Sequence, residues 1–197
     1  MALTLLLGCA SAPSTPARVI LPDAGTTSIV STPPPGLRLP TDVRPTGERL
    51  SLRLDPRATT FTGTARIQLT VGAPVAAFWL HAQDLTIRRA ILIQGGAEQP
   101  VRTVVVPPDL LEVRPGTRLA PGQAELVLEY EGPLDRERSR AIYRVEEQDG
   151  PYLYTFFEPV DARRAFPCFD EPSFKIPWEL EIAVPPGDGA FANTAEA

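Results

Sequence analysis

Apolar side chains occupy every second position in the segment from 174 to 184. They are Phe174, Ile176, Trp178, Leu180, Ile182 and Val184. A period of two places all of them on one face of an extended strand, because successive side chains of a strand point to opposite faces. Pro177 falls on the other face, which favours an edge strand or a position whose amide is not needed for pairing. The pattern predicts a β-strand here.

The same alternation occurs near the start of the folded region, at Leu50, Leu52 and Leu54, and again from Ala65 to Val71. Shorter strands are predicted at 75–80, 85–93, 101–106, 110–113, 124–131, 141–145 and 152–158. Many short strands separated by Gly and Pro turns predict an all-β fold, either an antiparallel β-sandwich or a saddle-shaped sheet. Helix is expected for a turn or two around 162–166.

The chain divides into three parts by composition. Residues 1–9 are predicted to be a truncated lipoprotein-type signal, since an apolar run and a small residue precede Cys9. Residues 10–36 are rich in Pro, Ser, Thr and Ala, and such a segment is predicted to be a disordered tether. Residues 37–197 form one predicted β domain. The alternative for the first two parts is an ordinary disordered N-terminus in which Cys9 carries no lipid.

The charge of the chain argues against nucleic acid as a partner. The chain has 19 Lys and Arg against 24 Asp and Glu, a formal net charge of −5. No basic stripe interleaved with aromatic residues is present, so nucleic-acid binding is not expected. No apolar run approaches the about 20 residues that a membrane-spanning helix needs. Any membrane association is therefore expected to come through lipid on Cys9.

Residues 154–175, YTFFEPVDARRAFPCFDEPSFK, combine several features that stability alone does not require. Glu158 is followed at once by a proline, and a pair of arginines, Arg163 and Arg164, lies close to Asp161. This segment resembles the signature at the end of the N-terminal β domain of the aminopeptidase N family, the gluzincin zinc metallo-aminopeptidases. The phrases FTGTARIQLTV (61–71), FWLHAQDL (78–85) and YEGPL (130–134) resemble the same family in the same order.

The resemblance implies a zinc enzyme, but this chain lacks the motifs that bind zinc and catalyse the reaction. Gluzincins hold zinc through H-E-x-x-H and a further glutamate. The chain contains one histidine, His81, has no H-E-x-x-H, and lacks the family's G-x-M-E-N motif, because its single methionine is Met1. We therefore expect no metal site, no catalytic residue and no enzyme activity in this chain alone. Zinc is expected in the complete enzyme, supplied by a catalytic domain that is missing here.

Glu158 is the candidate substrate-binding residue. The resemblance implies that it binds the free α-amine of a peptide N-terminus, a task that suits a carboxylate because an ammonium group is recognised by charge-assisted hydrogen bonds. The alternative is a surface glutamate, or a partner of Arg163 or Arg164. Phe156 stands where the family often has glutamine, which affects side-chain selectivity.

The other charged residues of this segment are predicted to be scaffold. They are Asp161, Arg163, Arg164, Asp170 and Glu171. Cys168 and His81 are predicted to pack in the core rather than to act as a catalytic pair. The resemblance also implies that the peptide bond after Glu158 can be cis, and because Pro159 weakens the trans preference we expect a cis Glu158–Pro159 bond. Glu158 should then be partly exposed, with Phe166, Cys168 and Trp178 inside.

Two functional hypotheses follow from these observations. The first is the N-terminal domain of an exported, lipid-anchored aminopeptidase of the bacterial cell envelope, capping the active site and presenting Glu158 to the substrate amine. The second is a stand-alone lipid-anchored β-sandwich module for binding or assembly, without catalysis.

Overall fold

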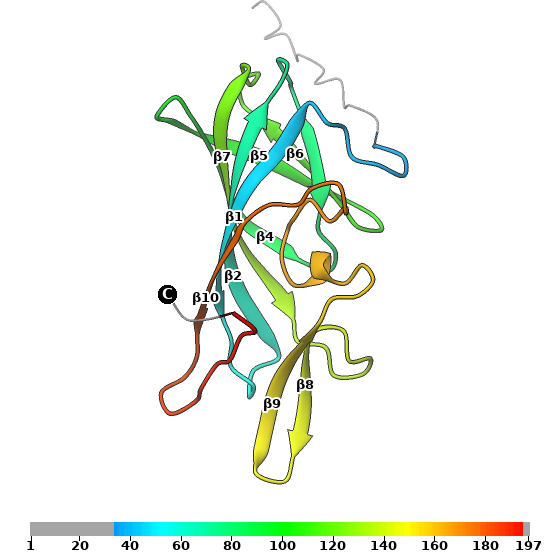
Figure 1. The fold of residues 1–197 in the computed structure, drawn as a ribbon, viewed down its shortest axis with the longest axis vertical. Coiled ribbons are helices and arrows are strands. Elements are labelled where there is room, and N and C mark those ends of the chain that lie inside the picture. The colour runs from blue at the N-terminus through cyan, green and yellow to red at the C-terminus, as the bar shows by residue number, and fades with distance from the viewer. Residues whose placement is uncertain (1–33, 195–197) are drawn as a thin grey trace, which may run out of the picture. The chain divides into compact units, whose positions relative to one another are not determined.

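The computed structural model describes residues 34–194. Cys9 and residues 10–33 of the predicted tether lie outside these residues. The described part contains ten strands and one short 3-10 helix (Figure 1). The strands are β1 Val43–Arg53, β2 Thr60–Val71, β3 Phe78–His81, β4 Thr86–Gln94, β5 Ala97–Val106, β6 Leu110–Pro115, β7 Gly122–Pro133, β8 Ala141–Glu147, β9 Gly150–Phe156 and β10 Trp178–Ala183, and the helix η1 is Ala162–Arg164.

Eight of the strands form one curled sheet in the order β10-β1-β2-β7-β4-β5-β6-β3. Neighbours pair antiparallel except β1 and β10, which run parallel. Strands β8 and β9 form a separate two-stranded hairpin that projects from the end of the sheet (Figure 1). The last strand is thus added to the sheet edge beside the first, and the Glu158 segment lies between the hairpin and this edge.

The core occupies the inner face of the curled sheet. On β2, Ala65, Ile67 and Leu69 are fully buried, while Arg66 between them faces solvent and pairs with Glu125 on β7. A strict alternation of this kind gives a strand one apolar and one charged face. The curl brings the inner faces of distant strands together, so a single sheet can enclose its own core.

The prediction of an all-β fold is confirmed, as are the expected edge strand and the helical turn near residue 162. Each predicted short strand is present, with bounds that differ by a few residues. The apolar alternation from 174 to 184 gives a shorter strand than the pattern suggested. Its first residues lie in a turn, where the Phe174 amide donates to the Glu171 carbonyl.

The predicted burial of Trp178 is wrong. Phe166 and Cys168 are buried as expected, but Trp178 is 47 % exposed. One side of its ring contacts Phe166, at a centroid distance of 5.2 Å. The other side is open, because β10 is the edge strand and no other described strand covers its inner face. A period of two shows that the apolar side chains share a face, but it cannot show whether that face is covered.

Candidate substrate-facing surface

Glu158 lies two residues beyond the end of β9, in the loop that leads to η1. The Glu158–Pro159 peptide bond is cis, as the sequence predicted. A turn follows at once, since the Asp161 amide donates to the Phe157 carbonyl at 2.8 Å. The Glu158 side chain is exposed and makes no hydrogen bond or ion pair with any residue in the described part of the chain. Its carboxylate is therefore available to an external group.

The two arginines after Glu158 have other partners. Arg163 is buried, and its Nε donates to Asp170 Oδ2 at 2.8 Å while its Nη1 pairs with Asp109. Its Nη2 also donates to the backbone carbonyl of Asp170 at 3.2 Å. Because a guanidinium offers several donors in a fixed plane, it can hold two carboxylates and a carbonyl at once. Arg163 thus ties the segment after Glu158 to the body of the sheet.

Arg164 forms a second, smaller set of contacts. It pairs with Asp161 at 3.0 Å and with Asp84, which lies in the loop between β3 and β4. The Arg163 carbonyl accepts a hydrogen bond from the Gln83 amide in the same loop. Glu171 accepts from the Leu39 amide at 2.6 Å and so holds the start of the described chain. These residues have the structural contacts expected of a scaffold.

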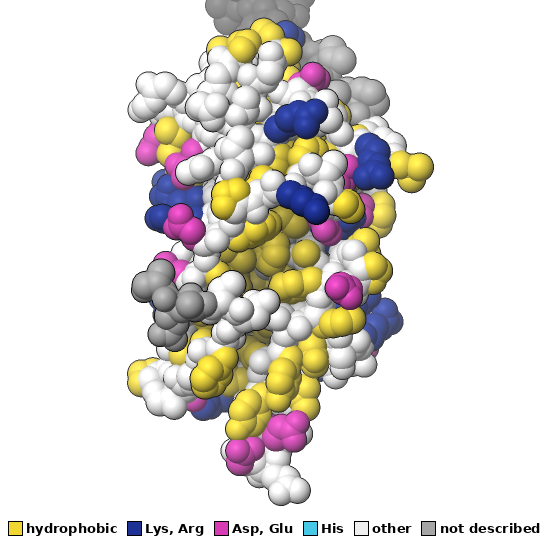
Figure 2. Space-filling view, in the orientation of Figure 1, with side chains coloured by type: hydrophobic (Ala, Val, Ile, Leu, Met, Phe, Trp, Pro, Cys, Tyr) yellow, Lys and Arg dark blue, Asp and Glu magenta, His cyan; other side chains and the backbone are white. Residues whose placement is uncertain are grey.

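An apolar hollow borders the Glu158 loop. Figure 2 shows a continuous band of apolar side chains in the hollow between β10 and the β9–η1 segment. Large side chains that are about half exposed on the elements bordering this hollow, which are β9 with the loop after it and β10, are Tyr152, Tyr154, Phe156, Val160, Trp178 and Leu180. Soluble monomers rarely leave so many large apolar groups open in one region. We define these six residues as the open apolar surface.

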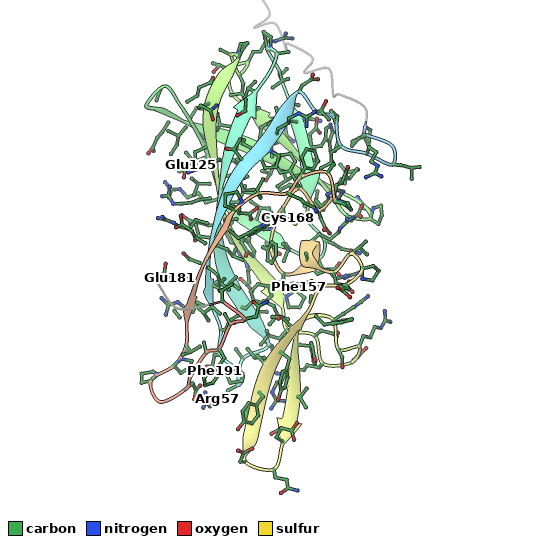
Figure 3. The ribbon with its side chains drawn as sticks, in the orientation of Figure 1. Arg57, Glu125, Phe157, Cys168, Glu181 and Phe191 are labelled. Atoms are coloured by element: carbon green, nitrogen blue, oxygen red, sulfur yellow. The ribbon has the colours of Figure 1, made fainter. Side chains whose placement is uncertain are left out.

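The lower part of this surface is a groove with a volume of about 740 Å³. The β8–β9 hairpin contributes Tyr152, Leu153 and Tyr154, and the C-terminal segment contributes Ile182 and Val184. The rings of Tyr152 and Tyr154 stack at 6.5 Å, and Tyr154 stacks in turn on Tyr143 at 5.8 Å. Phe191, labelled in Figure 3, also lines the groove and is 97 % exposed. Arg57, Asp149 and Asp188 also line the groove, so it has both apolar and charged walls.

His81 and Cys168 pack inside, as predicted, and face each other across a short backbone bridge. The His81 amide donates to the Cys168 carbonyl at 2.8 Å, and the return hydrogen bond is 3.0 Å. Burial, with the nearby positive charge of Arg163, lowers the pKa of His81, and its Nδ1 accepts from the Asp170 amide at 3.2 Å. Burial raises the pKa of the Cys168 thiol well above its ordinary value. A thiol of this kind is a core residue and not a nucleophile.

The residues present do not fit a zinc site. Within residues 34–194, no three His, Cys, Asp or Glu side chains are grouped so that they could hold a metal ion. The single imidazole already uses Nδ1 in a structural hydrogen bond.

No helix among residues 34–194 is long and apolar enough to cross a membrane.

Sequence reasoning missed two buried carboxyl groups, that of Glu112, which pairs with Arg114, and that of Glu48. Glu48 lies on β1 with 3 % exposure, on the same face as Leu50 and Leu52. The signal was present in the sequence, because the alternation of Leu50, Leu52 and Leu54 extends back to position 48. A charged residue in phase with an apolar face is a candidate for an unusual environment.

Comparison with known proteins decides the family. The profile of the Peptidase M1 N-terminal domain matches residues 44–197. The chain belongs to the Peptidase M1 N-terminal domain family. This confirms the resemblance on which the sequence analysis relied, and the matched region contains all ten strands except the first residue of β1.

Relatives of this family member come from plants and animals. The chain is 36 % identical over 162 residues to Aminopeptidase M1-D of Oryza sativa subsp. japonica. It is 32 % identical over 167 residues to Endoplasmic reticulum aminopeptidase 1 of Homo sapiens and 30 % identical over 167 residues to Glutamyl aminopeptidase of Homo sapiens. Each alignment covers 79 or 80 % of this chain but only 18 % of the relative. The chain thus spans about a fifth of the length of these relatives.

Proposed function

We propose that this chain is the N-terminal, non-catalytic domain of a zinc metallo-aminopeptidase that removes N-terminal amino acids from peptides. The observation that carries the proposal is the match of residues 44–197 to the Peptidase M1 N-terminal domain, together with relatives that are named aminopeptidases. Zinc and the catalytic residues would come from a downstream region. The role of this domain is to cap the active site and to bind the substrate amine.

Glu158 is the proposed amine-binding residue. Its carboxylate is exposed and unpaired, while both neighbouring arginines are held by Asp109, Asp170, Asp84 and Asp161. An ammonium group is bound well by a carboxylate that has no competing partner, because a charge-assisted hydrogen bond is stronger than a neutral one. The Arg163 and Arg164 contacts keep the loop that carries Glu158 in place.

The open apolar surface is the proposed docking face for the downstream catalytic region. It lies beside the Glu158 loop, so a domain that covers it would enclose this carboxylate at the edge of a cleft. Burying half-exposed aromatic and aliphatic side chains stabilises an interface by roughly 25 cal/mol per Å² of apolar area. The free Glu158 carboxylate would then become more strongly attractive to a cation, because a water-poor cleft has a lower effective dielectric constant.

The test is aminopeptidase kinetics on the full-length protein with its downstream region. Changing Glu158→Gln should lower kcat/KM for aminoacyl substrates by about 30-fold or more, since losing one member of an enclosed charge pair costs about 2 kcal/mol or more. Glu147→Gln, an exposed glutamate on the β8–β9 hairpin, is the matched control and should leave kcat/KM unchanged. Equal kinetics for wild type and Glu158→Gln would contradict the role proposed for Glu158.

The stand-alone module is the competing hypothesis, and within residues 34–194 no group of His, Cys, Asp or Glu side chains could hold a metal ion. The two hypotheses differ in the downstream coding sequence. An H-E-x-x-H motif in frame after residue 197 supports the enzyme. An intact terminator and an expressed short protein support the module.

Export and anchoring through Cys9 form a separate proposal. The order of residues before Cys9 and the Pro-rich segment after it support a lipid-anchored protein of the bacterial cell envelope. Cys9→Ser, expressed with the full upstream leader, should move the protein from the membrane fraction to the soluble fraction. Unchanged membrane fractionation would count against lipidation.

A further inference from the structure

The carboxyl group of Glu48 is enclosed by the core. Both of its oxygens are inaccessible to solvent, and neither has a hydrogen-bond partner among residues 34–194. No basic side chain in this part of the chain forms an ion pair with it. Placing an unpaired ionised carboxylate in such a site costs so much free energy that the group keeps its proton instead. Burial accordingly raises the pKa of Glu48 well above its ordinary value.

The groups around Glu48 cannot neutralise its charge. Across the sheet it lies opposite Ile67 of β2 on one side and Trp178 of β10 on the other, neither of which titrates. Tyr130 on β7 and Cys168 after η1 are the titratable groups that interact with it, and both carry raised pKa values. Both are neutral when protonated, so neither compensates a negative charge on Glu48. Figure 3 labels Cys168 beside η1.

Glu48 also lies where the pairing between β1 and the edge strand β10 begins. Its pairing with Trp178 is the first of the β1–β10 ladder, and its backbone amide donates to the Pro177 carbonyl at 3.1 Å. The register of β1 against β2 shifts between Pro45 and Gly47, immediately before Glu48. Strand β10 has β1 as its sole neighbour in the described sheet. Glu48 therefore lies at the first of the six residue pairs that join β10 to the sheet.

We propose that Glu48 is a proton-dependent latch for strand β10. With the carboxyl group protonated, β10 stays paired with β1; when Glu48 loses its proton, the β1–β10 edge opens so that the carboxylate can reach water. Strand β10, which the latch would release, carries Trp178 and Leu180, both part of the open apolar surface. Opening it would therefore alter that surface without unfolding the rest of the sheet.

The direction of the effect follows from linkage. A carboxyl group whose pKa is higher in the closed state than in the open state binds more protons when closed. Its contribution to closure is complete below its ordinary pKa and is lost as pH rises toward the raised pKa. Between these two values the ratio of open to closed molecules rises about tenfold for each pH unit. Acid favours the latched edge and alkali favours release.

The test is hydrogen exchange of the individual amides in the 197-residue chain between about pH 5 and pH 8, corrected for the intrinsic pH dependence of exchange. Amides of the β1–β10 ladder should lose protection by about tenfold per pH unit in wild type, while amides of the β2–β7 ladder should not. In Glu48→Gln and in Glu48→Leu, this local loss should vanish. Glu179→Gln is the matched control, because Glu179 belongs to the same β1–β10 ladder, on β10, but is exposed and pairs with Arg49.

Any of three hydrogen-exchange results would overturn the latch. The first is pH-independent protection of the β1–β10 amides in wild type. The second is an equal loss in the Glu48→Gln and Glu48→Leu variants. The third is a parallel loss over the whole sheet, which would indicate global unfolding and not release of an edge. Infrared spectra of the wild type add a test that does not depend on whether any variant folds. A buried carboxyl group that is protonated at neutral pH gives its own C=O stretching band. Absence of that band would also overturn the proposal.

Discussion

The Nε of Arg163 donates a hydrogen bond of 2.8 Å to Oδ2 of Asp170 and joins the short helix η1 to the segment that follows it. The same guanidinium pairs with Asp109 in the turn between β5 and β6. One side chain thus connects the Glu158 loop to a distant part of the sheet. Its burial distinguishes it from the exposed ion pairs on the outer face, such as that of Arg66 with Glu125.

Arg163→Met should destabilise the domain by about 2 kcal/mol or more, because it leaves two carboxylates without their cation. The cost should stay near the low end of the range for buried pairs, since both acids keep about a quarter of their side-chain surface exposed. Arg66→Met is the control and should cost under about 1 kcal/mol, as exposed pairs do. Urea unfolding of both variants measures the difference, and equal costs would contradict a structural role for Arg163.

Gly132→Ala should destabilise the domain through a steric clash. A Cβ at position 132 would lie 2.6 Å from Phe61 Cζ and 2.7 Å from Leu85 Cδ2, in the buried part of β7. Overpacking of a filled core costs about 1 to 3 kcal/mol. At Gly116 the nearest atom would be 3.7 Å away, so Gly116→Ala should change the free energy of unfolding by under about 0.5 kcal/mol. If the Gly132 variant is as stable as the Gly116 variant, the core beside Phe61 and Leu85 has room for a methyl group and the predicted clash is wrong.

Cys168 should resist thiol reagents in the native state. Burial raises its pKa, and the thiolate is the reactive form. In a Cys9→Ser background, labelling with a disulfide reagent should be at least about 100-fold slower in buffer than in denaturant. Fast stoichiometric labelling of the folded protein would place the thiol at the surface.

Trp178 should dominate quenching of the protein's fluorescence by acrylamide. The chain has two tryptophans, and Trp79 on β3 is buried while Trp178 is about half exposed. Trp178→Phe should therefore leave an emission that acrylamide quenches only weakly. If the proposed downstream region docks on the open apolar surface, it should shield Trp178 from acrylamide, as the core already shields Trp79. Equal quenching of the isolated domain and the full-length protein would contradict docking at this face.

The local pattern of the sequence was enough to predict the strands. The side chains of β2 alternate between core and solvent over the whole strand, and so do those of β1 after its bulge. The DARRAFPCFDEP phrase likewise indicated a compact loop with paired charges, and within it Arg163 pairs with Asp170 and Arg164 with Asp161. These features depend on residues close in the chain or on the period of a single strand, which the sequence shows directly.

Tertiary structure alone decided which apolar faces are covered and which polar groups are enclosed. Trp178 and Leu180 continue a regular apolar alternation, yet they stay open because β10 was placed at the sheet edge, parallel to β1. Glu48 continues another alternation and is enclosed in the core, where Tyr130 and Cys168 interact with it electrostatically. Periodicity assigns a side chain to a face, but burial depends on contacts between strands far apart in sequence, and those contacts exist only once the sheet has closed on itself.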